Sequence, residues 1–140
     1  MLLKMLQEQI SRYWNEISES VKLASFNGIT DNKLNAMLVL LLSGKMQCWV
    51  STNEEGDKIE GIVLTKFSDD FTGKILVVLS LYALKASTLK TWSTGLETLK
   101  EFARTTGCYS MVAQVNDDRY VKLLEKLGAK ADIKIVTFKL

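Results

Sequence analysis

The sequence contains no histidine and no proline, and only two of its 140 residues are cysteine. The lack of histidine excludes imidazole-based acid–base catalysis and the usual zinc ligand sets. Cys48 and Cys108 lie 60 positions apart without a CxxC or similar spacing, so we expect no metal site. Both have apolar neighbours, which favours buried free thiols over a disulfide and predicts a reducing, cytoplasmic location.

Long apolar runs are also missing. The apolar run at 36–42 is far too short to cross a bilayer, and Lys4 and Glu8 interrupt the N-terminal stretch where a signal peptide needs an apolar core. The P-loop, the dinucleotide GxGxxG motif and the GxSxG nucleophile elbow are absent as well. We therefore expect a soluble protein that is neither a nucleotide-dependent enzyme nor a serine hydrolase of that type.

The composition is that of an ordinary globular chain, with 47% hydrophobic and 24% charged residues. This length and apolar content predict a single domain over residues 1–140. Residues 1–70 carry a net charge of -3 and residues 71–140 a net charge of +5. The excess of positive charge in residues 71–140 would favour an anionic ligand. The lysines are scattered, however, which is more typical of solvated helix faces than of a nucleic-acid-binding surface.

Hydrophobic periodicity predicts two helices followed by strands. Apolar residues recur at steps of three and four over residues 2–20, which indicates an amphipathic helix. A second helix is capped by Thr30 or Asp31 and ends near Gly44. From Met46 the apolar residues follow the two-residue period of strands, which predicts an antiparallel meander. Its predicted strands are 46–52, 58–67 and 74–84, of which the last is the most apolar and is expected at the centre of the sheet.

The second half alternates helix and strand after a polar segment at 85–91. The predicted elements are a helix from Trp92 to Gly107, a strand at 109–115, a helix capped by Asn116 or Asp117 and closed by Gly128, and a strand at 133–140. The predicted fold class is α/β in the α+β sense: a twisted, mostly antiparallel sheet flanked by helices.

Three segments of the second half carry a further pattern: LKEFARTTG at 99–107, VN at 115–116 and LEKLGA at 124–129. Together with the order of elements, they resemble the GNAT family of acyl-CoA N-acyltransferases. The topology covers nearly the whole chain, whereas the motif match is confined to residues 96–129. The resemblance implies a mixed sheet, acetyl-CoA as the cofactor, and direct attack of an amine on the thioester, whose carbonyl is polarised by central-strand amides.

In this family the fourth strand is followed by an Arg/Gln-x-x-Gly-x-Gly/Ala loop, whose amides at a helix N-terminus bind the pyrophosphate of coenzyme A. The corresponding residues 86–92 read ASTLKTW and contain no glycine. A Cβ obstructs close approach of phosphate to the backbone. The alternative is a plain N-capping turn with a solvated lysine. The resemblance implies these cofactor-binding candidates: Ser87, Thr88, Lys90, Thr91 and Asn116.

Catalytic residues are harder to assign. Many family members place a tyrosine before the EKLG stretch to protonate the departing thiolate, and this position is Leu124 here. Tyr82 and Tyr120 are the candidate substitutes, although both suit structural roles at a core edge. Glu60 is the strand-borne acid of the hairpin and the candidate general base; a surface ion pair with Lys58 is the alternative.

Two functions stay open at this point. One is an acetyl-CoA-dependent N-acetyltransferase with an eroded cofactor loop, which the topology supports. The other is a non-catalytic protein-binding or virion-associated module, which the missing glycines and Leu124 support. The segments 47–50 and 81–82 also resemble GNAT-like proteins of phage genomes. The sequence indicates neither the amine substrate, nor a protein partner, nor the oligomeric state.

Overall fold

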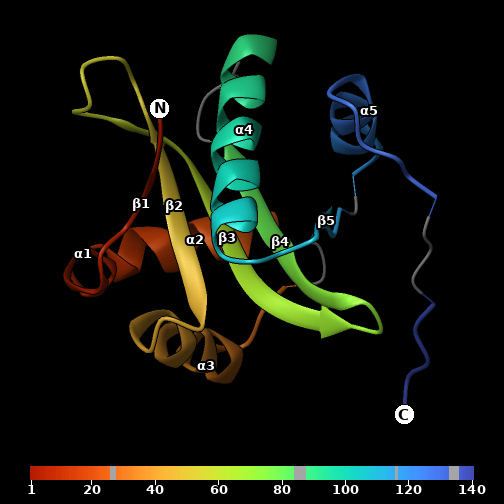
Figure 1. Cartoon of the computed structure of the whole chain (residues 1–140). Coiled ribbons are helices and arrows are strands. Elements are labelled where there is room, and N and C mark those ends of the chain that lie inside the picture. The colour runs from red at the N-terminus through yellow and green to blue at the C-terminus, as the bar shows by residue number, and fades with distance from the viewer. Residues whose placement is uncertain (26–27, 84–87, 116, 133–135) are drawn as a thin grey trace.

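The computed structural model describes residues 1–25, 28–83, 88–115, 117–132 and 136–140. These residues form a five-stranded sheet in the order β1-β2-β3-β4-β5, with helices on both faces (Figure 1). β1 to β4 are mutually antiparallel, and β5 runs parallel to β4. The elements are β1 (Leu2–Lys4), α1 (Gln7–Arg12), α2 (Trp14–Ala24), α3 (Asp31–Leu42), β2 (Met46–Thr52), β3 (Ile59–Asp70), β4 (Gly73–Ala83), α4 (Leu89–Thr105), β5 (Ser110–Ala113) and α5 (Asp118–Lys126). The predicted fold class is confirmed.

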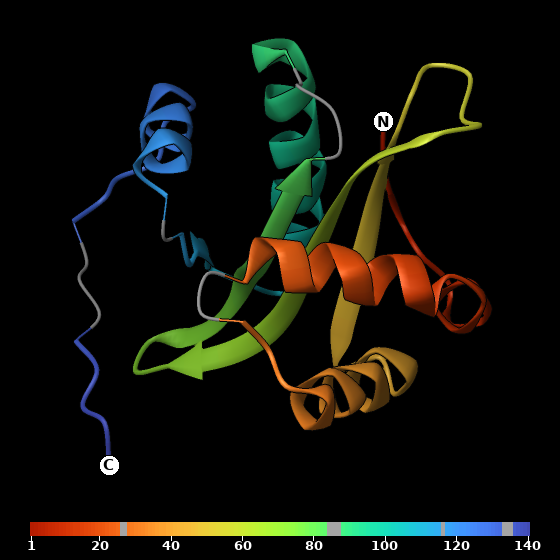
Figure 2. The same ribbon diagram turned by 180° about the vertical axis from the view of Figure 1, so that it is seen from behind.

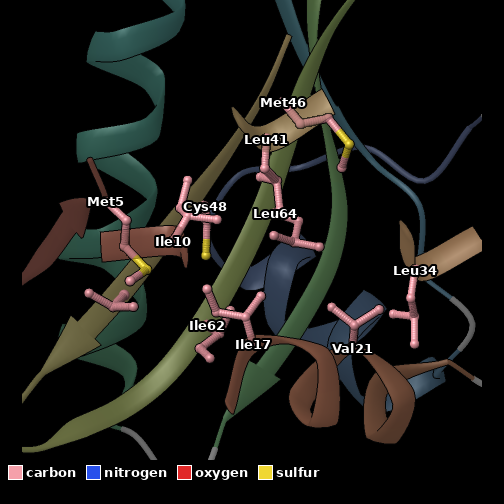
Figure 3. Packing of buried hydrophobic residues seen from close by; sticks show 11 residues of the cluster. Met5, Ile10, Ile17, Val21, Leu34, Leu41, Met46, Cys48, Ile62 and Leu64 are labelled. Carbon is pink, nitrogen blue, oxygen red and sulfur yellow. The ribbon is translucent and has the colours of Figure 1, made fainter. Parts of the chain in front are cut away.

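The sheet separates two apolar clusters, because successive strand residues point to opposite faces. Cys48 belongs to the cluster beneath α1, α2 and α3, whereas its neighbour Trp49 belongs to the cluster beneath α4. Figure 2 shows α2 and α3 on the face of the sheet opposite α4. Figure 3 shows the larger cluster from close by; its labelled residues are Met5, Ile10, Ile17, Val21, Leu34, Leu41, Met46, Cys48, Ile62 and Leu64.

β4 is an interior strand, as its apolar sequence predicts, but it is the fourth of five strands, and the middle of the sheet is β3. It pairs with β3 on one side and β5 on the other. Its consecutive residues Leu76, Val77 and Val78 are all buried, which requires that both faces of the strand are covered. On the α4 face, Phe102 packs edge-on against Trp49 and stacks on Phe67. These ring contacts of Phe102 hold α4 against the sheet and cover that face of it.

A buried polar chain crosses the β2–β3 pair beneath α4. The Trp49 indole donates to Thr65 Oγ1 over 3.0 Å, and Thr65 donates to Gln47 Oε1 over 2.8 Å. Gln47 in turn donates to the carbonyl of Gly44. All three side chains are buried, so each needs its partner to offset the loss of hydration. This series of hydrogen bonds links Gly44, after the end of α3, to the core beneath α4.

The helix boundaries follow the predicted capping residues. Thr30 caps α3 by accepting from the Lys33 amide, and Asp117 caps α5 by accepting from the Arg119 amide. The prediction had left a second candidate open at each site. Gly107 follows α4 with a φ of +86°, a conformation that favours glycine. No helix within the described residues has the length and apolar character of a membrane span.

The predicted helix over residues 2–20 is wrong in its first third. Leu2–Lys4 forms an edge strand against β2, and the helical part is divided at Tyr13 into α1 and α2. The Met5 amide also donates to the Cys48 carbonyl over 2.8 Å. The apolar spacing suits a helix, but strand pairing with β2 satisfies the same backbone groups and buries Leu2 beneath α4.

Other corrections concern strands. β3 continues to Asp70, three residues past the predicted end, because Asp70 Oδ1 accepts from the Thr72 and Gly73 amides and closes a tight turn to β4. β5 is shorter than predicted, at Ser110–Ala113. The predicted final strand is not formed in its described part: residues 136–140 are irregular and exposed. An alternating pattern needs a neighbouring strand, and here none is paired with it.

Both cysteines are free thiols in different environments. Cys48 is fully buried, and burial raises the pKa of its thiol to about 12. Cys108 is only half-buried, so the prediction of two buried thiols holds for Cys48 alone.

Candidate functional site

The first turn of α4 is organised by threonine hydroxyls. Thr88 Oγ1 accepts from the Thr91 amide over 3.2 Å and lies 3.0 Å from the Thr91 hydroxyl. The Trp92 amide donates to the Thr88 carbonyl. Among the described residues, no acceptor bonds the amides of Leu89 and Lys90, the other two donors of the first turn. A helix of 17 residues directs the positive end of its dipole here.

A cavity of about 690 Å³ lies between this turn and the tip of the β2–β3 hairpin. The structure brings four predicted site residues to its lining: Glu60, Thr88, Lys90 and Thr91. Glu60 comes from the start of β3 and is half-buried, whereas the other three come from the N-terminal end of α4. Residues 28 or more positions apart in sequence thus share one site.

The hairpin makes this cavity acidic on one side. Glu54 and Glu55 of the β2–β3 loop line it with Glu60, and Lys90 faces it from the helix end. Sequence reasoning treated 53–57 as a turn and missed both loop carboxylates. The sequence shows that Glu54 and Glu55 at the hairpin tip lie close to Glu60 and make this region acidic. Only the packing of α4 places them beside a helix N-terminus.

Trp92 connects the first cavity to α5. Its ring lines the cavity and contacts the ring of Tyr120, with centroids 5.8 Å apart and planes 57° apart. Tyr120 is half-buried in the first turn of α5. The candidate acid Tyr120 therefore lies across an indole ring from the residues at the start of α4.

Three further candidates are less defined. Tyr82 stands in β4 with its backbone opposite Ile62, and its side chain is outside what the structure describes. Ser87 and Asn116 lie outside the described residues. No group of three or more Cys, Asp or Glu side chains within the described ranges could hold a metal ion.

β4 is paired with β5 over only part of its length. The pairing runs from Ile75 and Ser110 to Val78 and Ala113, and the Gln114 amide donates to the Val78 carbonyl over 3.1 Å. β4 then continues to Ala83, while the chain after β5 turns toward α5 (Figure 1). β4 and the chain that follows β5 therefore diverge at the end of the sheet where α4 begins (Figure 1).

A second cavity of about 750 Å³ lies on the other side of α4, next to this divergence. It is lined by β5, by α5, by Val78 of β4 and by Leu96 and Leu99 of α4, the last two of which also line the first cavity. The middle of α4, at Leu96 and Leu99, thus stands between an acidic cavity and a largely apolar one.

Solved structures that are similar to this chain include acetyltransferases. Aminoglycoside N-acetyltransferase AAC(6')-Iy, in complex with a coenzyme A bisubstrate analogue, superposes with a TM-score of 0.79 at 11% identity over 100% of this chain and 97% of its own. AAC(6')-Ih from Acinetobacter baumannii gives 0.74 at 13% identity over 100% and 97%. An aminoglycoside acetyltransferase from an uncultured soil sample gives 0.75 at 14% identity over 100% and 94%.

The chain has the GNAT fold. By sequence alone, neither a family model nor a curated protein matches it, so the likeness is one of structure. The order of the described elements and the mixed sheet, antiparallel except for the β4–β5 pair, agree with the GNAT topology that the sequence resembles.

Two positions depart from the GNAT pattern. The segment 86–92, where the resemblance places the pyrophosphate loop, contains no glycine, and its described part begins α4 with a threonine cap. Leu124, which stands where many GNAT enzymes have tyrosine, is buried. The nearest described tyrosine on α5 is Tyr120, one helical turn earlier.

Proposed function

We propose that this protein transfers an acetyl group from acetyl-CoA to a cationic amine, using a threonine-capped helix start in place of a glycine loop. The observation that carries the proposal is the lining of the first cavity. There, Thr88, Lys90 and Thr91 at the positive end of α4 lie together with Glu60 on a GNAT scaffold.

The first turn of α4 suits the diphosphate of coenzyme A. The amides of Leu89 and Lys90 supply hydrogen-bond donors, the Lys90 ammonium supplies charge, and the helix dipole favours an anion. Hydroxyl groups of Thr88 and Thr91 replace the close backbone approach that glycine permits. The expected consequence is weaker cofactor binding than a glycine loop gives.

The apolar cavity beside Val78 accommodates the pantetheine arm, and main-chain amides at the end of β4 polarise the carbonyl. Acetyl-CoA, when bound, supplies the acetyl group as a thioester. Glu60, together with Glu54 and Glu55, holds a protonated amine, and Glu60 accepts its proton before attack. The solved structures of the same fold that are named as aminoglycoside N-acetyltransferases support an amine acceptor.

Tyr120 is assigned to protonate the departing thiolate, with the Trp92 ring fixing its position. Tyr120→Phe should lower kcat about tenfold or more while leaving the affinity for acetyl-CoA unchanged. Tyr82→Phe is the matched comparison, since Tyr82 is the other tyrosine candidate. A kcat drop in the Tyr82 variant alone would transfer the role to that residue.

Calorimetry with acetyl-CoA and thiol-release assays over a panel of diamines and aminoglycosides test the proposal. A Lys90→Ala, Thr91→Ala double substitution should weaken acetyl-CoA binding about tenfold or more, and Glu60→Gln should lower turnover without changing that binding. Lys22→Ala on α2, an exposed lysine on the opposite face of the sheet, is the control and should bind as the wild type. No heat at millimolar acetyl-CoA contradicts the proposal.

That negative result would support a second function, a protein-binding module without catalysis, including the phage-type and virion-associated readings. The observation that favours it is the pair of departures at 86–92 and Leu124. Co-purification with one stoichiometric partner, in the absence of any acetyl-CoA binding, is the result expected for this function.

A further inference from the structure

Gly95 is a glycine in the interior of α4 that the fold itself does not require. It lies in the second turn of a 17-residue helix, where glycine is less favourable than alanine. Its φ is not positive, unlike that of Gly107 after the helix. A Cβ added at Gly95 would lie 4.0 Å from the Leu2 side chain, and no other described atom beyond its neighbours and its own helix would lie within 4 Å. Neither backbone conformation nor packing within the described chain therefore explains the glycine.

Gly95 lines the first cavity, of about 690 Å³, in a region where the other lining side chains are apolar. Leu2 and Leu99 are buried in the cluster beneath α4, and Val63 packs against that cluster. With two half-buried residues of α4 they make up the apolar floor of the cavity, which consists of Leu2, Val63, Trp92, Leu96 and Leu99.

The cavity has its charged groups at one end. Lys90 lies in the first turn of α4, and Glu54 and Glu55 lie in the β2–β3 loop. Figures 1 and 2 both show that loop at the end of the sheet where α4 begins. The α4 part of the apolar floor extends from Trp92 to Leu99, which is about 10 Å along a helix axis. A ligand that fills the cavity therefore meets charge at one end and apolar side chains farther along α4.

We propose that the acceptor of this protein is an amine that carries an apolar chain or ring, and that Gly95 determines this specificity. The proposal rests on the proposed function for the ammonium group, which lies at Glu60. The apolar body of the amine lies on the apolar floor and against the backbone of Gly95, an approach that a side chain would obstruct. The cavity volume falls in the range of roughly 300–1,000 Å³ found for small-molecule sites.

The same floor disfavours amines whose body is covered with hydroxyl groups. Leu2, Leu96 and Leu99 offer no side-chain hydrogen bond, so a hydroxyl placed against them loses water without a replacement. A methylene placed there instead gains about three- to fourfold in affinity. The protein should therefore prefer an alkylamine to an amino sugar of similar size.

Calorimetry with butylamine, hexylamine, octylamine and glucosamine, in the absence of acetyl-CoA, tests the proposal. Affinity should rise about three- to fourfold for each methylene that enters the cavity, and glucosamine should bind more weakly than hexylamine. Glu60→Gln should weaken all three alkylamines by the same factor, because it changes the charged end and leaves the apolar floor intact. Equal affinities for the alkylamines, tighter binding of glucosamine, or no binding of octylamine at millimolar concentration would overturn the proposal.

Substitutions at Gly95 identify the contact itself. Gly95→Leu should weaken octylamine binding about tenfold or more, because the added side chain takes the place of the ligand, and should leave acetyl-CoA binding unchanged. Gly95→Ala should weaken octylamine binding less and should not lower the thermal midpoint, since its Cβ fits. Thr105→Leu, which adds the same side chain at an exposed position in the last turn of α4, is the control. Unchanged octylamine binding in Gly95→Leu would contradict the proposal.

The results also distinguish this specificity from acetyl transfer itself. Acetyl-CoA binding without a preference for the longer alkylamines would remove the specificity and keep the transferase. Octylamine binding that depends on Gly95, without any acetyl-CoA binding, would support the amine site and contradict acetyl transfer.

Discussion

At the scale of single residues, Thr65 is the most constrained polar group in the core. It is fully buried and bonded to both Trp49 and Gln47. Thr65→Val keeps the volume but leaves the indole N–H and the Gln47 carbonyl oxygen without this partner. We expect a loss of about 2 kcal/mol in the free energy of unfolding, measured in urea.

The control for this change is Thr105→Val in the last turn of α4, where the hydroxyl is exposed and bonds only a carbonyl of its own helix. Its free energy of unfolding should shift by less than about 0.5 kcal/mol. Equal losses in the two variants would show that the buried chain from Trp49 to Gln47 does not stabilise the core.

A second residue-scale feature gives a pH dependence. The Tyr109 hydroxyl donates to Asp70, which lowers the pKa of the Asp70 carboxyl and raises the pKa of Tyr109. The lowered pKa gives stability that is present above about pH 4 and is lost as pH falls through the folded-state pKa of Asp70. The raised pKa gives stability that is present below about pH 10 and is lost as pH rises through the folded-state pKa of Tyr109.

Tyr109→Phe removes both contributions. The difference in urea midpoint between wild type and variant should be largest between about pH 5 and pH 9 and should shrink toward both extremes. Tyr13→Phe, an exposed tyrosine at the α1–α2 junction, is the control. A difference that does not change with pH would refute the Asp70–Tyr109 linkage.

At the scale of elements, the cap of α4 has two roles. Thr88 both starts the helix and shapes the proposed anion site. Thr88→Ala should reduce the free energy of unfolding by about 1 kcal/mol, because the Thr91 amide loses its acceptor. Thr88→Ser retains a capping hydroxyl and should restore most of this loss. Thermal unfolding monitored by circular dichroism measures the stability of both variants. An unchanged midpoint in Thr88→Ala would show that the cap does not stabilise α4.

At the scale of the whole molecule, burial is uneven. β2, β3 and β4 lie between the two apolar clusters, whereas α5 contributes only Leu124 to the buried core and residues 136–140 are exposed. Hydrogen exchange should therefore be slowest in β3 and β4 and fast in residues 136–140. Uniform exchange across the chain would contradict this distribution of stability.

Much of the fold could be predicted from the sequence because its signals are local. The caps at Thr30 and Asp117, the glycine after α4 and the apolar run of β4 depend on neighbouring residues, and the structure has them as expected. The GNAT topology followed from the order of these elements. The candidate residues at the start of α4 were found through the same order, although the helix begins at Leu89, three residues before the predicted Trp92, so that Lys90 and Thr91 lie in its first turn.

Tertiary structure decided what depends on distant partners. The sequence predicts a helix at Leu2–Lys4, which instead pairs as a strand with β2. It predicts a strand at 133–140, whose described part, residues 136–140, pairs with none of the described strands. Packing of α4 across the hairpin brought Glu54 and Glu55 to the cavity. Periodicity along a chain determines which elements can form, whereas hydrogen bonding between strands and the burial of faces determine which do form and which side chains meet.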